Sequence, residues 1–330
     1  MSKTIILQNK PAISGFAAVV GKKENEGPLK GLFDGVHNDT TCGEKSWEKA
    51  EVEMLQNAQN LAISKAGNKE NAIEVAFSGD LLNQCIGSTF ALKNSKIPAI
   101  GMYGACSTMA LALANAAVFV DSKTIKSAIA SASSHFCTAE RQFRMPLEYG
   151  GQRVPSAQWT VTGAGACVVE QEGGGPKISA VSFGRIVDYH QTDVNNMGAA
   201  MAPAARDTIY NFLKDSGRQI ADYCKIFTGD LGAVGGKILC ELMNEKSIDI
   251  SQIHEDCGTI IYDLNMQEVD SGGSGCGCSA SVLCAKILPE LSLGRLKKVL
   301  FVGTGALMSV TSQQQGETIP AIAHLVDIEA

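Results

Sequence analysis

The sequence predicts an α/β fold made of two duplicated halves, because three motifs occur twice in the same order along its 330 residues. The first motif is an apolar strand ending in Gly-Asp, the second a tight turn that opens a helix of small residues, and the third a buried strand after a basic turn. In the two halves these motifs lie at residues 74–81 and 225–231, 104–107 and 277–280, and 125–132 and 297–304. Three matches in order indicate a repeated α/β unit.

Each Gly-Asp strand follows an amphipathic helix. Residues 47–65 carry Ala50, Met54, Ala58 and Leu61 on one face. Residues 203–215 carry Ile209, Phe212 and Leu213 on one face, with Gly217 as the expected stop. This spacing is typical of helices that cover a sheet.

The junction between the halves is predicted at the Gly-Gly-Gly-Pro cluster of residues 173–176. We therefore expect a first half over residues 1–172 and a second half over residues 176–330. A chain of this length can bury a large core, so we expect the two halves to form one compact unit.

Composition excludes several classes of protein. A net charge of −6 argues against a nucleic-acid surface or a basic membrane patch. The apolar run at residues 111–120 stops at Asp121, too early to cross a membrane, and the N-terminus lacks a secretory signal. Eleven scattered cysteines, an odd number, fit a reducing compartment better than a disulfide framework. We therefore expect a soluble, intracellular protein.

The first tight turn, Gly-Ala-Cys-Ser at residues 104–107, has the pattern of a nucleophile elbow. It follows the apolar run 97–103 and opens a helix over residues 108–117. Cys106 is thus expected at a strand's carboxyl end, facing the positive end of a helix dipole, and both effects favour thiolate. The alternative is a small buried thiol in a tight turn.

A duplicated α/β half with a cysteine elbow in the first copy resembles the thiolase superfamily. The resemblance implies a five-layer α-β-α-β-α fold and a homodimer. Further motifs resemble those of the stage V sporulation protein AD family, in order along nearly the whole chain. They lie at residues 26–29, 78–84, 104–108, 133–135, 138–144, 148–152, 201–205, 256–258 and 272–276.

The second resemblance implies a sporulation and germination protein of a spore-forming bacterium. Its ligand would be dipicolinic acid (pyridine-2,6-dicarboxylate), alone or as the calcium chelate, taken up into the developing spore. Its partners would be other stage V sporulation membrane proteins. It would be soluble or peripherally associated with the spore inner membrane.

Thiolases and ketoacyl synthases activate the elbow cysteine with residues from the second half, where histidine is common. On this chain the corresponding positions fall on Gly229 and Asp230 and near Cys276, and none of these is histidine. Where thiolases keep a second cysteine, residues 303–306 read Gly-Thr-Gly-Ala. Because Cys106 lacks an evident base, we expect a binding protein without catalytic activity and without a cofactor.

The alternative is an acyltransferase of the thiolase or ketoacyl-synthase type. Such an enzyme would form an acyl-Cys106 intermediate from a coenzyme A thioester. Its base would have to come from elsewhere in the chain, and His135 and His254 are the candidates.

Cations are the first candidates to bind a dicarboxylate, because guanidinium groups pair with carboxylates in a bidentate manner. His135 follows a buried strand and is expected where strand ends meet the elbow. Arg141 and Arg144 come next, and their alternative is a salt-bridge cluster with Glu140. Lys23, in a glycine-flanked loop, is a further candidate, and the alternative there is a solvated run of charges.

Asp230, Asp256, Cys106 and Cys276 complete the expected ligand-binding set. For Asp230 the alternative is turn formation or helix capping, and Asp256 is expected as a polar wall between the halves. His254 and the Cys-Gly-Cys sequence that begins at Cys276 invite a metal hypothesis. Cysteines two positions apart are poor chelators of one ion, so no metal site is predicted.

Overall fold

The computed structural model describes residues 3–67, 70–143 and 153–330, and a 12-stranded sheet runs through it. Five strands from the first half follow one another in the order β2 (Ala12–Gly21), β8 (Gly163–Glu170), β6 (Ser127–Ser134), β4 (Val75–Gly79) and β5 (Ala99–Gly101). Five from the second half follow in the order β9 (Lys177–Phe183), β14 (Ala321–Glu329), β13 (Lys298–Ala306), β10 (Lys225–Thr228) and β11 (His254–Asp256).

The two sets of strands have the same order and the same directions. In each set the first two pairings are antiparallel and the last two are parallel. The sets join where Ala12 pairs with Lys177. Two further strands, β1 (Lys3–Ile6) and β3 (Gly35–His37), pair with β9 and β2. This shared topology confirms the predicted duplicated α/β fold.

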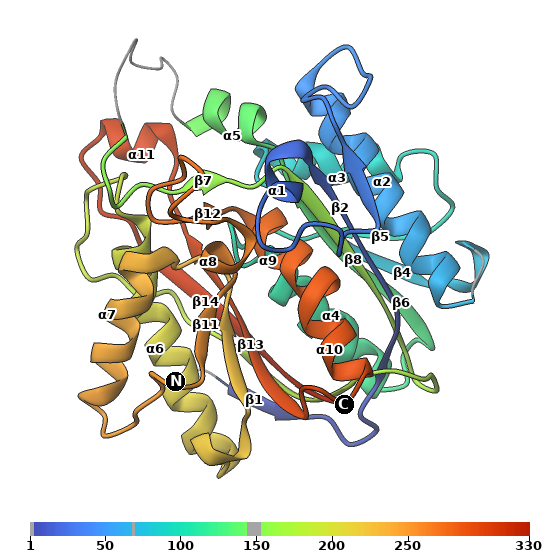
Figure 1. Ribbon diagram of the computed structural model, residues 1–330. Coiled ribbons are helices and arrows are strands. Elements are labelled where there is room, and N and C mark those ends of the chain that lie inside the picture. Colours follow the sequence, from blue (N-terminus) through green and yellow to red (C-terminus); the bar gives the residue numbers. More distant parts are fainter. Residues whose placement is uncertain (1–2, 68–69, 144–152) are drawn as a thin grey trace.

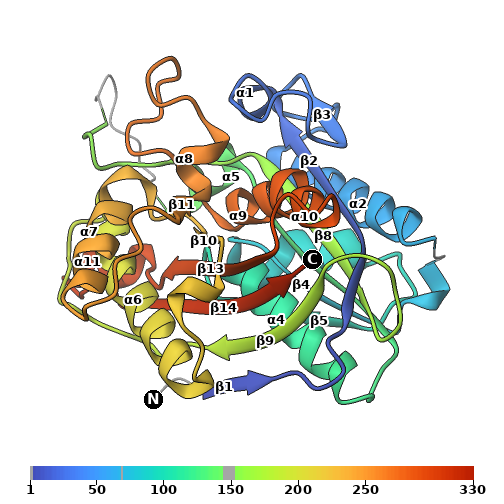
Figure 2. The same ribbon diagram turned by 60° about the horizontal axis from the view of Figure 1, so that its bottom comes forward.

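Helices cover and separate the two sets of strands in five layers, α-β-α-β-α (Figures 1 and 2). One outer layer holds α2 (Trp47–Lys65) and α3 (Ile86–Leu92), and the other holds α6 (Met197–Ser216) and α7 (Gly232–Asn244). The middle layer holds α4 (Thr108–Asp121), α9 (Cys276–Val282), a π-helical turn (Leu283–Ile287) and α10 (Leu288–Ser292).

The middle helix α4 contacts β6 and β4 of the first half and β13 and β14 of the second. It is therefore buried almost all round, and small side chains suit this position because they let strands pack closely on both sides. Its fully buried alanines are Ala110, Ala112, Ala114, Ala116 and Ala117. This packing places the N-terminus of α4, and the elbow before it, at the centre of the molecule.

Short elements gather where the parallel strands end, near the top of Figure 1. They are α1 (Lys22–Asn25), α5 (Phe136–Phe143), β7 (Trp159–Thr160), α8 (Cys257–Ile261), β12 (Gly273–Ser274) and α11 (Val310–Gln314), with β7 and β12 paired as a small separate sheet. The 3-10 turn Asn83–Cys85 follows β4 and bonds to α5, since the N–H of Asn83 donates to Gln142 Oε1 at 3.1 Å. The 3-10 turns Glu70–Ala72 and Ile220–Asp222 precede β4 and β10.

The helix boundaries test the predictions made from periodicity. Helix α2 has the predicted bounds, and the Ser46 side chain caps it by accepting from the backbone N–H of Lys49. Helix α6 starts at Met197 rather than near residue 203, because Asn196 caps its N-terminus and Pro203 lies within the helix. It ends as predicted at Gly217, whose φ is +69°.

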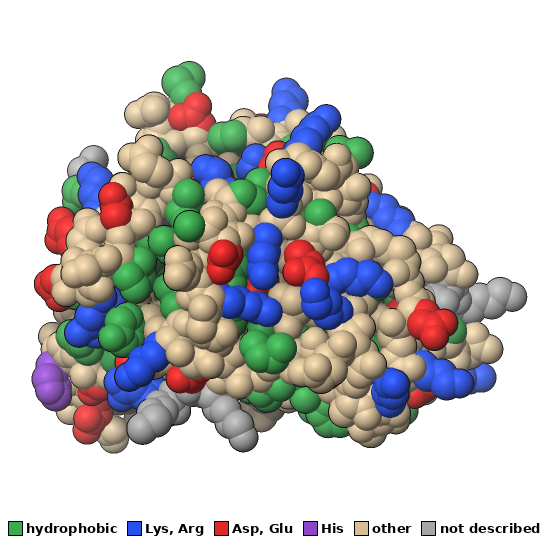
Figure 3. Space-filling view, turned by 90° about the horizontal axis from the view of Figure 1, so that it is seen from below, with side chains coloured by type: hydrophobic (Ala, Val, Ile, Leu, Met, Phe, Trp, Pro, Cys, Tyr) green, Lys and Arg blue, Asp and Glu red, His purple; other side chains and the backbone are tan. Residues whose placement is uncertain are grey.

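No helix within the described ranges has the length and apolar character needed to cross a lipid bilayer. All eleven cysteines are free thiols in the structure. The face seen from below carries Lys and Arg side chains interspersed with Asp and Glu (Figure 3).

Candidate functional site

The elbow cysteine lies just before α4 in a strained, closely packed turn. Ala105 has a φ of +50°, which non-glycine residues seldom adopt and which is often found at functional sites. A Cβ on Gly305 of β13 would lie 2.3 Å from the carbonyl oxygen of Gly104. This close approach of the second half leaves Cys106 only 7% exposed.

The thiol of Cys106 faces a hydroxyl and a carboxyl group of the second half. Its Sγ lies 4.0 Å from Ser274 Oγ. Ser274 Oγ in turn donates to Asp230 Oδ2 at 3.2 Å, and the N–H of Gly275 donates to the same oxygen at 3.0 Å. Thr304 Oγ1 donates to Asp230 Oδ1 at 2.8 Å. The predicted position at Asp230 therefore does lie beside the elbow, and it holds a carboxyl group.

Ser274 lies at this site but is not among the residues predicted from the sequence. The second tight turn was matched to residues 277–280, but α9 already begins at Cys276. Counting back from each helix start makes Ser274 the counterpart of Cys106, since α4 begins at Thr108. The repeated small residues Gly, Cys and Ser at positions 272–281 allowed this shift in register.

The surroundings of Cys106 overturn the prediction that its thiolate is favoured. Burial raises the pKa of the Cys106 thiol well above its usual range, and the charge of Asp230 raises it further. Burial also raises the pKa of Asp230 to about 6. These two effects outweigh the helix dipole. A buried thiolate at Cys106 would lose its hydration and would be repelled by the negative charge of Asp230.

Cys276 lies in the same cluster, since its thiol interacts electrostatically with Cys106 and Asp230. Its Sγ donates to the carbonyl oxygen of Ser133 at 2.9 Å. Burial raises the pKa of Cys276 well above its usual range. The structure thus brings together three of the predicted residues, one from the first half and two from the second.

His135 lies at the end of β6, as predicted, but both of its ring nitrogens are bonded to the backbone. Nε2 lies 2.8 Å from the carbonyl oxygen of Thr40, and Nδ1 accepts from the N–H of Cys137 at 3.1 Å. This pattern sets Nε2 as the donor, and burial lowers the pKa of His135, which favours a neutral ring.

The other proposed base, His254, is hydrogen-bonded to Thr228 Oγ1 at 2.8 Å. All five histidines of the chain lie in the described ranges. Among the hydrogen bonds of these ranges, none joins a histidine to Cys106, whose partners are Ser274 and Asp230.

A cluster of cations and aromatic rings lies close to the elbow. Lys23 Nζ lies 4.1 Å from the centroid of the Trp159 ring, and the Arg153 guanidinium carbon lies 5.0 Å from it. Phe136 stacks on Trp159 with ring centroids 4.0 Å apart. Lys23 was predicted, whereas Arg153 and Trp159 were missed. The available signal was weak: Trp159 is one of two tryptophans in the chain.

Strand pairing connects this cation–aromatic cluster to the elbow. Strand β7, which begins at Trp159, pairs in parallel with β12, which ends at Ser274. Arg153 Nη1 donates to the carbonyl oxygen of Gln158 at 2.9 Å, and Gln158 Nε2 donates to the carbonyl oxygen of Asp230 at 2.7 Å. Lys23, Arg153, Asp230 and Cys106 are thereby parts of one continuous region.

The remaining predicted residues lie outside this region or do not face Cys106. Arg141 forms an ion pair with Glu48 and lies over the Trp47 ring, which matches the salt-bridge alternative except for the partner. Arg144 lies outside the described residues. Asp256 bonds to the loop that follows Asp230.

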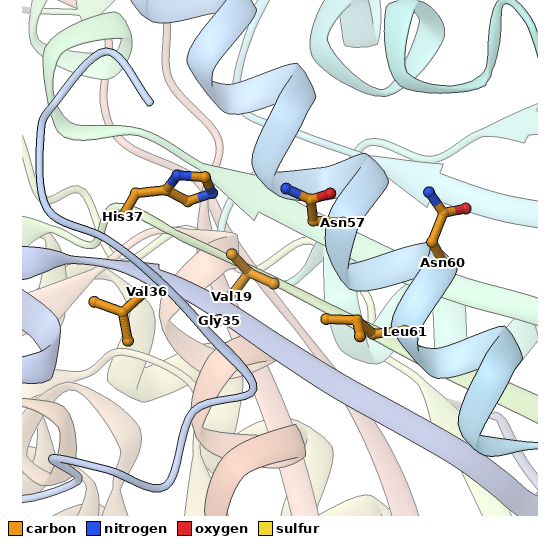
Figure 4. A pocket seen from close by; sticks show the side chains of 7 residues that line it. All are labelled: Val19, Gly35, Val36, His37, Asn57, Asn60 and Leu61. Atoms are coloured by element: carbon orange, nitrogen blue, oxygen red, sulfur yellow. The ribbon is translucent and has the colours of Figure 1, made fainter. Parts of the chain in front are cut away.

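A pocket of about 400 Å³ opens between β3 and α2, and none of the predicted site residues lines it (Figure 4). It is lined by Val19, Gly35, Val36, His37, Asn57, Asn60 and Leu61. In the described part of the chain, no three His, Cys, Asp or Glu side chains are placed to hold a metal ion together.

Comparison with solved structures identifies the fold. The chain is similar to 3-oxoacyl-[acyl-carrier-protein] synthase III from Aquifex aeolicus VF5, with a TM-score of 0.60 and 13% identity, covering 97% of this chain and 100% of that one. It is also similar to acetamide-bound OleA from Xanthomonas campestris, with a TM-score of 0.63 and 13% identity, covering 99% and 100%. These likenesses confirm the thiolase-like fold.

Comparison at the level of sequence is more specific. The family model for stage V sporulation protein AD matches residues 1–329. The chain is 43% identical over 327 residues to the stage V sporulation protein AD of Bacillus subtilis (strain 168), covering 99% of this chain and 96% of that protein. This chain therefore belongs to the stage V sporulation protein AD family.

Proposed function

We propose that this sporulation protein binds dipicolinic acid without transforming it, and acts in the uptake of dipicolinate into the developing spore. The observation that carries the proposal is the placement of Lys23 and Arg153 on one tryptophan ring beside the elbow. Dipicolinate is a flat aromatic ring with two carboxylates, so it calls for two cations and an aromatic surface. The family resemblance that implies this ligand supports the same choice.

The two cations are held by the protein in different ways. Arg153 Nη2 lies 2.9 Å from Glu140 Oε1, and its guanidinium also lies 5.4 Å from the Phe136 ring. Lys23 Nζ donates to the carbonyl oxygen of Glu268 at 3.4 Å. Arg153 is therefore fixed by Glu140 through Nη2 and by the carbonyl oxygen of Gln158 through Nη1. Both Arg153 and Lys23 keep further N–H donors for a ligand.

Titration calorimetry with dipicolinate tests the proposal directly. We expect saturable binding by the wild type, and a loss of affinity of about tenfold to a hundredfold in Lys23→Ala and Arg153→Ala, since each removes a charged hydrogen-bond donor. Pyridine-2-carboxylate, with one carboxylate, should bind more weakly to the wild type and lose less in either variant.

Matched controls are available for both cations. Lys22 neighbours Lys23 but lies near Glu26 at the surface, and Arg141 pairs with Glu48. Lys22→Ala and Arg141→Ala should therefore keep the wild-type affinity. The proposal is contradicted by a wild-type protein that shows no saturable heat change when it is titrated with dipicolinate.

The acyltransferase alternative has one observation in its favour, the strained elbow at Ala105 that places Cys106 before α4. Against it stand the protonated state of the thiol and the carboxyl group of Asp230 beside it. We expect incubation with acyl-coenzyme A to leave the intact mass of the protein unchanged. A mass increase of one acyl group, absent from Cys106→Ala, would establish the alternative.

The same proposal includes an exchange of ligand with membrane proteins. Dipicolinate, alone or as its calcium chelate, would be passed between this protein and other stage V sporulation proteins of the spore inner membrane. Calorimetry with and without equimolar calcium separates the two forms of the ligand.

We also propose that the protein forms a homodimer in which the two copies pair through β5. This strand stands at one end of the strand order, and Ala99, Ile100 and Gly101 are all exposed. Large apolar side chains lie on and near it, with Ile100 41%, Phe90 45% and Tyr103 48% exposed. A strand edge that no described strand covers, with apolar neighbours, is a pairing surface, and two copies related by a twofold axis cover each other's edges.

Sedimentation velocity measures the oligomeric state of the protein. The wild type should sediment as a dimer, and Ile100→Asp should be largely monomeric, because a charge at the centre of an interface costs about 2 kcal/mol or more. Leu293→Asp changes an exposed leucine after α10 and should remain dimeric. Equal sedimentation of wild type and Ile100→Asp would reject β5 as the interface.

A further inference from the structure

Asp256 was predicted to face the ligand, but its carboxylate is already fully engaged inside the protein. Oδ2 accepts from Thr228 Oγ1 at 2.6 Å and from the N–H of Leu231 at 2.8 Å. Oδ1 accepts from the N–H groups of Gly232 at 2.9 Å and Gly258 at 3.0 Å. The side chain is 3% exposed, so its oxygens have little capacity left for a ligand.

The bonds of Asp256 hold the residues that directly follow Asp230. The chain turns sharply there, since Gly232 has a φ of +67° and a Cβ on it would lie 2.5 Å from the carbonyl oxygen of Ser271. Asp230 itself points the other way, toward Thr304 and Ser274. The loop is thus fixed from behind by one carboxyl group and presents the other to the elbow.

In the first half, the corresponding loop after Asp80 is held by a different set of hydrogen bonds. There Asp80 is the counterpart of Asp230, because both follow a strand and a glycine in the repeated Gly-Asp-Leu motif. Asp80 Oδ1 accepts from the N–H of Leu82 at 2.9 Å, so this aspartate holds its own loop. Leu82 is the counterpart of Gly232, whose N–H is held by Asp256 instead.

Strand register explains why the first half lacks a group like Asp256. In the second half Thr228 pairs with Asp256, and in the first half the corresponding Ser78 pairs with Gly101. A glycine offers no side chain to hold the loop. The Asp80 carboxylate therefore turns back onto its own backbone and also accepts from Ser88 N at 2.7 Å.

We infer that Asp256 is a positioning residue of the candidate site: it takes over the loop-holding role of Asp80, and so frees Asp230 to face Ser274 and Cys106. The inference rests on the proposed function for its link to ligand binding. Thr228 and His254 complete the arrangement. Because the Thr228 hydroxyl donates to Asp256, it accepts from His254 Nε2 at 2.8 Å, which orients the imidazole behind it.

The test compares Asp256→Asn with the wild type in two measurements. One is the dissociation constant for dipicolinate by calorimetry. The other is the pH profile of alkylation of Cys106 by iodoacetamide, read on the Cys106 peptide by mass spectrometry. We expect affinity to fall at least about tenfold and the alkylation profile to move to lower pH by about one unit, as Asp230 leaves the thiol. In a protein that already carries Asp230→Asn, adding Asp256→Asn should not shift the pH profile of Cys106 alkylation any further.

Two sets of variants separate positioning from general stability. Asp80→Asn should lower the melting temperature and leave the Cys106 profile unchanged, because Asp80 holds a different loop. Thr228→Val removes the hydroxyl and should move the profile in the same direction as Asp256→Asn, whereas Thr228→Ser should match the wild type. The Thr228 pair decides the question if Asp256→Asn does not fold.

The outcomes also separate this inference from the proposed function. A wild type that does not bind dipicolinate rejects the proposed function, while the alkylation profile still reports on Asp256. An Asp256→Asn protein with wild-type affinity and a wild-type profile overturns the inference. Equal profiles for Thr228→Val and Thr228→Ser overturn it as well.

Discussion

Replacing Glu51 by glutamine is expected to abolish a large part of the pH dependence of stability. Glu51, on α2, is 1% exposed and accepts from Ser133 Oγ at 3.1 Å and Thr138 Oγ1 at 2.8 Å. Burial, together with the charge of Asp80, raises the pKa of Glu51 to about 8. The group is therefore protonated in the folded protein at neutral pH.

The direction of the effect follows from proton binding. The folded protein holds the Glu51 proton more tightly than the unfolded chain, so this stabilisation is fully present below about pH 4.5 and is lost as the pH rises through about 8. A rise from 4.5 to about 8 corresponds to roughly 5 kcal/mol, at about 1.4 kcal/mol per unit. Glu51→Gln keeps the shape of this side chain but removes its ionisable carboxyl group.

Urea unfolding at several pH values measures this difference. Between pH 5 and 9 the free energy of unfolding of the wild type should fall relative to that of Glu51→Gln by up to about 5 kcal/mol. Glu53→Gln, two positions along α2 where the side chain bonds to Asn57, should follow the wild type. Parallel pH profiles for wild type and Glu51→Gln would show that Glu51 is ionised in the folded protein.

Replacing Asp230 by asparagine is expected to change both stability and the chemistry of the elbow. Burial raises the pKa of Asp230 from 3.8 to about 6, which corresponds to about 3 kcal/mol. Its protonated form stabilises the protein fully below about pH 4, and this contribution is lost as the pH rises through about 6. Asp230→Asn should lack that decline between pH 4 and 7.

The same variant should make Cys106 more reactive, because a negative charge that opposes the thiolate is gone. We expect alkylation of the Cys106 peptide at pH 8 to be at least about tenfold faster than in the wild type. The exposed Cys224 serves as an internal control within the same sample, and its rate should not change. Unchanged alkylation of Cys106 would mean that burial alone sets its reactivity.

Local features of the fold could be predicted because they depend on nearby residues. The bounds of α2 follow from a capping serine at position 46 and an apolar face, and the end of α6 follows from Gly217. The repeated Gly-Asp strands are predictable for the same reason, since strand, turn and glycine lie within a few residues of one another.

The candidate site was predicted in part. Cys106, Asp230 and Cys276 do lie together, because all three follow repeated motifs at strand ends or helix starts. The charge state of Cys106 was predicted wrongly, since a helix dipole is visible in sequence and burial beside a carboxyl group is not. Ser274 was not predicted because the run of small residues at positions 272–281 shifted the match between the two tight turns. Arg153 was not predicted because its contacts with Trp159 and Glu140 arise only in the folded chain.

The sequence by itself determined the duplicated α/β architecture, the elbow at Cys106 and the lack of histidine at the expected second-half positions, because these depend on local pattern and residue identity. Only the tertiary structure decided which distant groups meet. Ser274 reaches Cys106 across 168 residues, and Asp256 supports the loop of Asp230 from a neighbouring strand. Such contacts are fixed by strand register and by the packing of two halves, and these arise only when the whole chain buries its core.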